Sequence, residues 1–580
     1  KTEKSGHFRL YTPPPPNRRS TKTMSQGQNN GLASQLVFAS LLVGLTVFLV
    51  VLCKPAPRVG DGMEYLLMTM AICEKGQTFA DQDVGRVYES FRRDSVEGYI
   101  PFSDLQIAFA SLSRNGEIDF PHFWFYSFLA SPFYLFLKCI GGPVDYCFVL
   151  LNICLLGLFV SAARSQFGNV GAIVAAAISL ASPALWFIDK GHTEFFSVSV
   201  GSIGVIYFLK QKYIRSFVAF ACLSTQNPPF ALIGLLVLGF WLWERLSDES
   251  RSLESRSVES RWRQGRWLMP GLLLGTAIIA LHPIYYYSRF GSLTPQMMTG
   301  AASSEFKGIR ALSCFIIDPD VGLLFNWPWL VVPLVAVPFY MVVWRQPVKK
   351  NLMIFVVLSI LILCWAQAKT NNFNHGGTVK ISRYALWYIP FLFPLLHRFA
   401  CNYSQVSNIQ KACCLFFVVA AVYFNSVKFW PHGGESYLFQ TRIAELFYDN
   451  FPTGYDPMPE IFLERNLRSE HEKEFWAISN RSGTKIIVHS GRYRKQRNRY
   501  FNKLDLGNVY GSKIKIEPGK LVEVVNEMHG IPGGKEIGDG TERAAWFYVN
   551  GPGDIFCSSE ARFIDRAVWT PSDRTEQSLR

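Results

Sequence analysis

Long apolar runs with almost no charged residues recur along the whole 580-residue chain. Such runs need a solvent other than water, and one of about 17–25 residues is long enough to cross a bilayer as a helix. Hydrophobic side chains make up 49% of the sequence and charged ones only 18%. The chain is therefore predicted to be an α-helical polytopic membrane protein. The clearest runs are residues 36–52, 272–284, 352–364 and 413–424.

The positive charge of the chain is distributed as in a membrane protein. The formal net charge is +14, but the lysines and arginines stand in short clusters between apolar runs. Such clusters are usually retained on the cytosolic face. No basic stripe with interleaved aromatic residues dominates the chain, so we expect no nucleic-acid partner. The 12 cysteines show no spacing typical of a disulfide framework or a zinc site.

The basic clusters also indicate which apolar runs cross the membrane. If every run spans, the clusters at Arg164, 210–215, 244–266 and 345–350 lie outside, against the usual bias. If residues 123–139, rich in aromatics, instead lie in the interface or re-enter, all of these clusters fall inside. This gives about eleven predicted spans, with the N-terminus in the cytosol, at residues 34–53, 144–163, 168–188, 194–210, 214–226, 229–245, 267–287, 324–344, 351–367, 384–399 and 412–430.

Three regions follow from this topology. Residues 1–33 are predicted to be a disordered cytosolic tail, with Met24 as an alternative native start. Residues 34–430 form a transmembrane domain with a long first outer loop at 54–143. Residues 431–580 form an extracytoplasmic C-terminal domain with an α/β or β-rich fold. The strand-like runs that indicate this fold, separated by turn residues, are 485–488, 521–525 and 545–549.

The segment GDGMEY at residues 60–65 follows the first apolar run and opens a predicted helix. Asp61 at the membrane surface is partly desolvated in this interpretation, which raises the pKa of a carboxylate toward that of a useful general base. Its proton would come from an acceptor hydroxyl or amine, and Glu64 stands beside it. The alternative is structural, because Asp61 and Glu64 also have the spacing of a helix capping box.

A second acidic turn follows the apolar run that ends at Phe187. It contains Asp189, Lys190, His192 and Glu194. Ionisable groups at membrane depth are costly unless they are paired or face water, so they indicate a functional site. The two carboxylates are candidate catalytic residues and His192 is a candidate substrate-binding residue. The alternative is that Lys190 only forms an ion pair with Asp189 or Glu194 at the membrane edge.

Two cations, Lys380 and Arg383, lie on the predicted outside, where the charge bias disfavours them. The phosphate of a lipid donor would explain their presence, because arginine offers forked donors to phosphate oxygens. Gly376 and Gly377 permit close approach of the backbone to such a group, and His375 belongs to the same candidate phosphate site. The alternative is that the two cations contact lipid headgroups by snorkelling.

Further residues are weaker candidates. His122 opens the segment predicted to re-enter and is a possible substrate-binding residue, whereas Asp320 is interpreted as a helix terminator before a span. Asp61, Glu64 and His192 could bind a divalent metal, but no spacing requires one. The sequence therefore requires no cofactor and leaves a divalent metal as an alternative.

In the order of these motifs the chain resembles the GT-C glycosyltransferases, in particular the bacterial relatives of protein O-mannosyltransferases and aminoarabinose transferases. The resemblance covers some two thirds of the chain, from about residue 36 to 430. Asn374 and His375 stand where a tryptophan often precedes the glycine pair of that family. The matching landmarks are residues 60–66, a His-bearing segment ending at 130–133, an acidic turn after 182–183, the run 318–324, and Gly376 and Gly377 followed by Arg383 and Tyr384.

The resemblance implies an inverting transfer from a polyprenyl-phosphate-linked sugar on the non-cytoplasmic side. Asp61 would be the base, Asp189 or Glu194 the second outer carboxylate, and Lys380 with Arg383 the donor phosphate site. It also implies that the chain is a multi-pass protein of a bacterial inner membrane, with membrane lipids as neighbours. No nucleotide-sugar fold is needed, and neither a Rossmann glycine motif nor a P-loop is visible.

Two other classes of function compete with this reading. A transporter or a flippase for lipid-linked sugars would use the same outer charges to hold a substrate without reacting with it. Such a protein should show inverted repeats, and no matching halves are detected in the sequence. A structural or assembly protein that acts through residues 431–580 would lose function with that region and tolerate Asp61→Asn.

Overall fold

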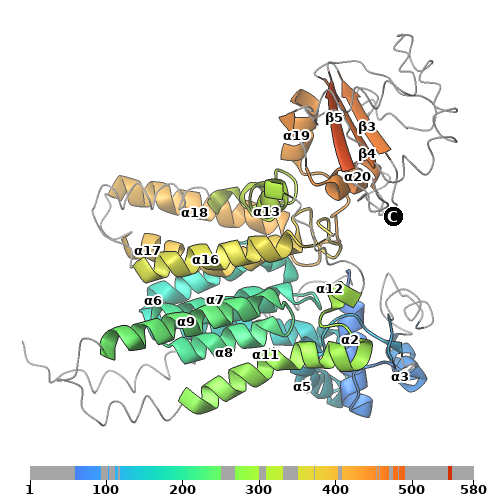
Figure 1. The fold of residues 1–580 in the computed structure, drawn as a ribbon, viewed down its shortest axis with the longest axis vertical. Coiled ribbons are helices and arrows are strands. Elements are labelled where there is room, and N and C mark those ends of the chain that lie inside the picture. Colours follow the sequence, from blue (N-terminus) through green and yellow to red (C-terminus); the bar gives the residue numbers. More distant parts are fainter. Residues whose placement is uncertain are drawn as a thin grey trace, which may run out of the picture.

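The described part of this computed structural model is a bundle of roughly parallel helices with shorter elements gathered at one end (Figure 1). The bundle contains α6 (Cys147–Leu180), α7 (Glu194–Leu209), α8 (Tyr213–Ser224), α9 (Pro229–Glu249), α11 (Leu268–Phe290), α16 (Lys350–Gln367), α17 (Phe393–Asn402) and α18 (Asn408–Lys428). The structure describes residues 59–92, 102, 111–114, 118–249, 268–298, 308–330, 350–370, 372–402, 408–451, 454–455, 457–468, 475–480, 483–489 and 546–551.

The length and composition of several helices suit a membrane. Among the described residues, 4 helices are long and apolar enough to cross one, and α7 and α8 are shorter apolar helices. Their outer faces expose large apolar side chains such as Leu273, Ile284 and Trp243, which suits contact with lipid tails. This agrees with the predicted helical class, while the count of about eleven spans stays a prediction. The candidates are Val144–Leu180, Pro229–Ser247, Leu268–Met298 and Lys350–Gln367.

The boundaries of two predicted spans differ from those observed. Residues 144–188 were predicted as two spans, and α6 is indeed interrupted at Gly168, which has φ 65° and ψ −158°. The helix then ends at Leu180, before a 3₁₀ turn, η2 (Pro183–Phe187). The predicted span 384–399 begins with a 3₁₀ segment, η4 (Arg383–Leu392), and only then becomes α17.

Pro390 lies inside η4, where it cannot donate a backbone hydrogen bond. The predicted span 34–53 and most of the span 324–344 lie outside the described residues.

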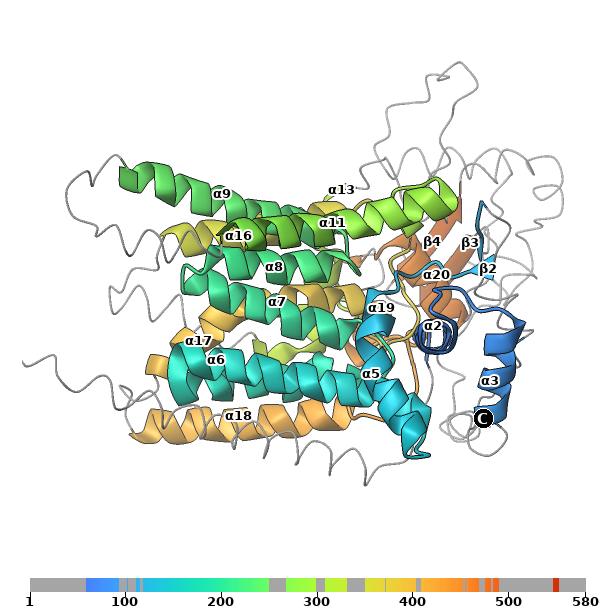
Figure 2. The ribbon, with the colours of Figure 1, turned by 90° about the horizontal axis from the view of Figure 1, so that it is seen from below.

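The segment predicted to re-enter is a helix at the end of the bundle, α5 (Phe125–Cys139). It packs against α2 (Gly62–Lys75) and α6 (Figure 2). The Ser127 hydroxyl donates to the Tyr65 carbonyl at 2.9 Å, and the Tyr134 hydroxyl donates to Glu74 at 2.8 Å. These bonds fix the first outer loop on the bundle, with α3 (Gln82–Arg92) beyond it.

The basic and acidic turns lie at opposite ends of α7. Glu194 begins the helix, and Lys210 follows its last residue, Leu209. At about 1.5 Å per residue, the 16 residues of α7 separate the two turns by about 24 Å. The Lys210 ammonium lies 4.3 Å from the centroid of the Phe167 ring, whose centroid is 4.4 Å from that of His397, so these residues share the basic end.

The C-terminal region begins with two helices, α19 (Arg442–Asn450) and α20 (Pro459–Leu467). A three-stranded antiparallel sheet of order β3-β4-β5 follows, in which Ile486 pairs with Ala477 and Val549. The strands are β3 (Phe475–Asn480), β4 (Gly483–His489) and β5 (Trp546–Gly551). Two predicted strand runs, 485–488 and 545–549, are thus strands, and the third, 521–525, lies outside the described residues. The extracytoplasmic placement of residues 431–580 stays a prediction.

A second, two-stranded sheet is formed by β1 (Ser111–Leu112) and β2 (Ile118–Asp119).

Candidate functional site

The centre of the candidate site is an ion pair between the Asp61 carboxylate and the Arg383 guanidinium. Asp61 stands directly before α2, and Arg383 begins η4, so the pair joins the first outer loop to the last one. Arg383 Nη1 donates to Asp61 Oδ2, and both side chains are mostly buried. A buried arginine needs such a carboxylate partner, because removing either charge from water is costly.

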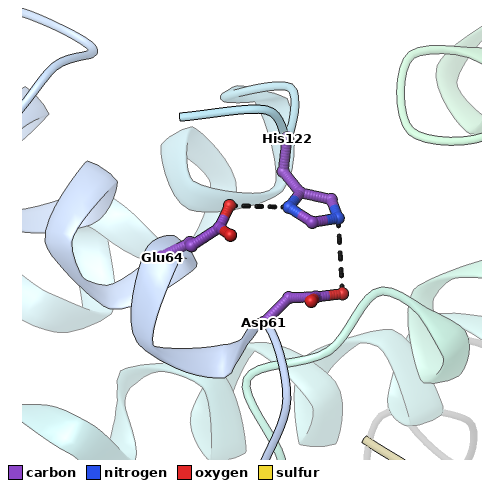
Figure 3. Close-up of side chains that lie close together, drawn as sticks. All are labelled: Asp61, Glu64 and His122. Atoms are coloured by element: carbon purple, nitrogen blue, oxygen red, sulfur yellow. Dashed lines mark hydrogen bonds and ion pairs between the residues drawn. The ribbon is translucent and has the colours of Figure 1, made fainter. Parts of the chain in front are cut away.

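His122 bridges Asp61 to Glu64 (Figure 3). Its Nδ1 lies 2.6 Å from Glu64 Oε2, and its Nε2 lies 3.3 Å from Asp61 Oδ2. The predicted capping box is wrong, since the Asp61 side chain makes no cap bond to the first turn of α2. Glu64 turns to the imidazole instead, and this pairing gives both carboxylates a role in the site.

Glu194 and His192 complete the group on the opposite side of Arg383. Arg383 Nε lies 3.9 Å from Glu194 Oε1, and His192 Nδ1 lies 3.4 Å from Glu194 Oε2. His192 Nε2 lies 2.8 Å from the Val59 carbonyl, a bond that ties the acidic turn to the start of the first loop. We call Asp61, Glu64, His122, Glu194 and Arg383 the carboxylate cluster.

Two glycines bring the loops of the carboxylate cluster together. A Cβ on Gly60 would lie 2.8 Å from the Gly377 Cα, and one on Gly377 would lie 2.7 Å from His192 Cε1. Both glycines have positive φ, +45° and +68°, which L side chains rarely adopt. Gly377 therefore packs against the Gly60 backbone and the His192 imidazole, and its predicted approach to a donor phosphate stays a prediction.

The charges in the carboxylate cluster shift one another's pKa values. Burial would raise the pKa of Asp61, but Arg383 and His122 outweigh it and hold that pKa well below its usual range. Burial opposes a charge on His122, yet Asp61 and Glu64 raise its pKa to about 9. Burial raises the pKa of Glu64. The cluster thus combines three carboxyl groups with two cationic partners near neutral pH.

A divalent cation has a plausible set of ligands here. Ligand atoms of Asp61, Glu64 and His122 lie within 4.8 Å of one another. Carboxylates and imidazole are common ligands of Zn²⁺ and Mn²⁺. The structure thus gathers His122 with the two carboxylates, whereas His192, the histidine considered from the sequence, faces Val59 and Glu194.

Asp189, the other candidate for the second outer carboxylate, has different neighbours. It accepts from the Lys190 ammonium at 2.7 Å and from the His432 backbone N–H at 2.8 Å. Lys190 is buried and lies 4.5 Å from the centroid of the Trp186 ring. The alternative interpretation of this turn, an ion pair of Lys190 with a neighbouring carboxylate, is the arrangement observed. Glu194, not Asp189, faces Arg383.

The residues that were predicted to form one phosphate site lie in separate environments. The charges nearest Lys380 are Glu445, Asp320 and Arg465, outside the carboxylate cluster, and burial lowers the pKa of its ammonium. His375 is buried, with its ring centroid 3.8 Å from that of Tyr384. Burial and the nearby Arg383 lower the pKa of His375, so this imidazole is neutral and adds no positive charge for a phosphate.

Several charged residues that bond to the loops of the site were missed in the sequence. Asp320, interpreted as a helix terminator, forms a buried ion pair with Arg465 at 2.6 Å. Glu435 accepts from the Gly377 N–H at 2.8 Å, and Glu460 accepts from the Phe373 N–H at 2.6 Å. Glu435, Glu460 and Arg465 stand in polar stretches that look like solvated surface. They differ from ordinary surface charges only in their hydrogen-bond and ion-pair partners, which are far away in the sequence.

Comparisons with known proteins give no family model and no curated protein that matches the chain. The chain is similar to the crystal structure of ArnT from Cupriavidus metallidurans in the apo state, with 14% identity, 69% of this chain and 65% of that chain covered, and a TM-score of 0.36. It is also similar to ArnT bound to undecaprenyl phosphate, with 14% identity, 66% and 61% covered, and a TM-score of 0.33. The chain matches less than two thirds of the length of ArnT.

Proposed function

We propose that the chain is a membrane glycosyltransferase that moves a sugar from a polyprenyl-phosphate donor to an acceptor on the non-cytoplasmic face. The observation that carries this proposal is the ion pair of Asp61 with Arg383. These are the base and the phosphate-binding cation of the mechanism implied by the sequence, and they are 322 positions apart. Their meeting at one end of a helical bundle is what such a mechanism requires.

The proposed reaction is a single inverting displacement. The acceptor oxygen or nitrogen attacks the anomeric carbon while the bond from that carbon to the phosphate oxygen breaks. The polyprenyl phosphate leaves with the bonding electrons, and Asp61 takes the proton of the acceptor. Arg383 stabilises the charge that develops on the phosphate, the kind of electrostatic aid that usually contributes most to such a reaction.

In this proposal Arg383 also controls the strength of the base. In the resting site it is bonded to Asp61 and keeps the pKa of that carboxylate low, which makes the carboxylate a weak base. A donor phosphate that draws the guanidinium away removes this effect, so the pKa of Asp61 rises when the donor is bound. His122 and Glu64 then hold the carboxylate in place.

The test uses full-length protein in proteoliposomes. Lipid extracts of cells that lack the chain supply the donor, because a sugar-phosphate polyprenol should accumulate there and its mass names the sugar. We expect Asp61→Asn to lower sugar transfer by about 10²- to 10⁴-fold, the usual contribution of a general base. Asp83→Asn is the matched control, since Asp83 is an exposed carboxylate on α3 that forms ion pairs with Lys75 and Arg86.

Two outcomes would contradict the proposal. Turnover that is unchanged in Asp61→Asn removes this residue from the mechanism. Movement of the intact lipid-linked sugar across the bilayer, with no transfer of the sugar, identifies a flippase instead. Sugar transfer in the presence of a chelator would separately show that the reaction needs no metal ion bound to Asp61, Glu64 and His122.

A further inference from the structure

Arg465 is a buried arginine that the proposed reaction does not use. It lies on α20, in the C-terminal region, and 3% of its surface is exposed. Its Nη1 forms the ion pair with Asp320 Oδ1, and its Nε donates to Asn374 Oδ1 at 3.0 Å. Its Nη2 donates to the Lys380 carbonyl. One guanidinium thus joins α20 to two loops at the site end of the bundle.

The residues that Arg465 contacts flank the glycine pair. We call residues 372–382 the late loop, since it runs from α16 to η4 and ends directly before Arg383. Arg465 holds it at Asn374 and again at Lys380, on either side of the Gly377 contact with Gly60. Lys380 has φ +56°, a conformation that a non-glycine residue keeps only where its surroundings enforce it.

Other bonds hold the late loop from the same side. The Glu460 carboxylate of α20 accepts from the backbone N–H groups of Phe373 and Asn374, at 2.6 and 3.3 Å. Glu464 accepts from the Asn374 side chain at 2.8 Å. The Ser382 N–H donates to the Val321 carbonyl at 3.0 Å, next to Asp320. The late loop is therefore fastened to α20 at its start and to the 318–322 turn at its end.

We propose that Arg465 is a positioning residue, which holds the late loop so that Arg383 reaches Asp61 and the donor phosphate. This inference rests on the proposed function and extends it, because it makes α20 part of the catalytic unit. A misplacement of about 1 Å can cost about 100-fold in rate, so fastening of this loop matters for the chemistry. The bonds of Arg465 go to Asn374, Lys380, Asp320 and Phe439 and not to the carboxylate cluster, so it acts through the late loop.

The experiment compares full-length Arg465→Gln with Arg442→Gln. Arg442 lies on α19 with its side chain 74% exposed and forms an ion pair with Glu445, so it is a matched arginine outside the late loop. The first measurement is hydrogen exchange of the peptide 372–383 in detergent. We expect lost protection in Arg465→Gln and wild-type protection in Arg442→Gln. Equal protection in both variants overturns the inference, whatever the enzyme assay gives.

The second measurement separates kcat from the KM for the lipid donor. We expect kcat/KM to fall by about tenfold or more in Arg465→Gln, with a raised donor KM, because a displaced Arg383 binds the donor phosphate less well. A variant that was merely less stable would lose active molecules and lower kcat without raising KM, and that result would overturn the positioning role.

Two further variants separate folding failure from failure of the proposal. Arg465→Lys keeps the positive charge but loses the forked donors of the guanidinium. We expect its protection of the peptide 372–383 and its kcat/KM to lie between those of wild type and Arg465→Gln. Glu460→Gln leaves Arg465 and Asp320 intact and weakens the hold on Phe373, so it should loosen the same peptide to a lesser degree. If wild-type protein transfers no sugar, the proposed function fails, while the exchange data still decide whether Arg465 fastens the late loop.

Discussion

Arg383 has a carboxylate on each side, Asp61 in direct contact and Glu194 at 3.9 Å. The two carboxylates balance the charge of this buried arginine, so the side chain can stay charged at the end of the bundle when no substrate is bound. It also sets the cost of binding a phosphate, because the donor must compete with Asp61 for the guanidinium. The contact with Arg383 therefore contributes less free energy to the binding of a donor phosphate than a contact with an unpaired cation would.

Replacing this arginine tests that competition. In Arg383→Ala we expect the KM for the lipid donor to rise by about tenfold or more, since a charge-assisted bond to phosphate is lost. The acidic limb of the kcat/KM profile should also move to higher pH, because Asp61 loses the cation that lowers its pKa. Arg86→Ala, at an exposed arginine of α3, should leave both unchanged. An unaltered KM would remove Arg383 from the donor site.

His122 predicts a pH dependence of stability. Its pKa is raised from 6.5 to about 9 in the folded protein, so its protonated form is favoured by folding. The stability that it contributes is complete below pH 6.5 and is lost as the pH rises through about 9. Thermal unfolding of the detergent-solubilised protein should show this loss, and His122→Gln should flatten the curve between these pH values. The same slope in both proteins would contradict the assignment.

At the scale of single residues, the sequence predicted which residue types carry the chemistry better than it predicted their partners. Asp61 was selected from its position after the first apolar run and Arg383 as a cation on the predicted outside, and they meet. Lys380 was selected on the same ground as Arg383, but although only two residues separate them along the chain, the charges that act on Lys380 include Glu445 and Asp320. The direction of a side chain in an irregular loop depends on tertiary contacts that no local pattern contains.

Among the elements, helix α6 fastens the acidic turn through one side chain. The Asn152 amide donates to the carbonyls of Phe187, Ile188 and Lys190, at 3.2, 3.1 and 3.2 Å. The Tyr126 hydroxyl of α5 donates to its oxygen at 3.0 Å. A buried asparagine inside an apolar helix thus bonds to backbone carbonyls at the end of η2 and in the acidic turn. His192 and Glu194 belong to the same turn.

Asn152→Ala should therefore destabilise the protein more than a typical loss of one hydrogen bond. Each buried carbonyl left without a donor costs about 1–3 kcal/mol, and three lose the same donor group. We expect a clearly lower Tm and reduced transfer activity. Asn351→Ala at the other end of the bundle, where the side chain donates to Glu244 at 3.2 Å, is the control and should change Tm little. Equal shifts in the two variants would show that Asn152 does not fasten the turn.

The type of most elements was accessible from the sequence, and their exact limits were not. Apolar runs predicted helices because lipid and helix interiors select the same residues. They did indicate the break in α6, because residues 144–163 and 168–188 were predicted as separate spans and the helix is interrupted at Gly168. They could not indicate that η4 is a 3₁₀ segment. Likewise, the strand β3 has no clear alternation of its own and was not predicted.

For the whole molecule, the proposal requires the two ends of the bundle to face different compartments. Helix α2, which Asp61 precedes, and α5 lie at one end of the bundle, and the turn between α7 and α8, which contains Lys210, lies at the other (Figure 2). The charge bias of membrane proteins places the basic end in the cytosol. The reaction would then take place on the outer side, where a lipid donor presents its phosphate.

Two native cysteines can test this sidedness. Cys139 is exposed at the end of α5, and Cys401 is exposed on α17 near His397. In single-cysteine variants of intact cells, a membrane-impermeant maleimide should label Cys139 and should label Cys401 only after the membrane is permeabilised. The reverse pattern would place the carboxylate cluster in the cytosol and end the proposal.

The contact between Gly60 and Gly377 also bears on attempts to alter the substrate of this protein. Because two backbones and the His192 ring meet with no side chain between them, the first loop, the acidic turn and the late loop form a matched set. A chimera that imports any one of these loops from another transferase brings a different backbone path against the other two. Grafting all three together is therefore the exchange that we expect to preserve an intact active centre.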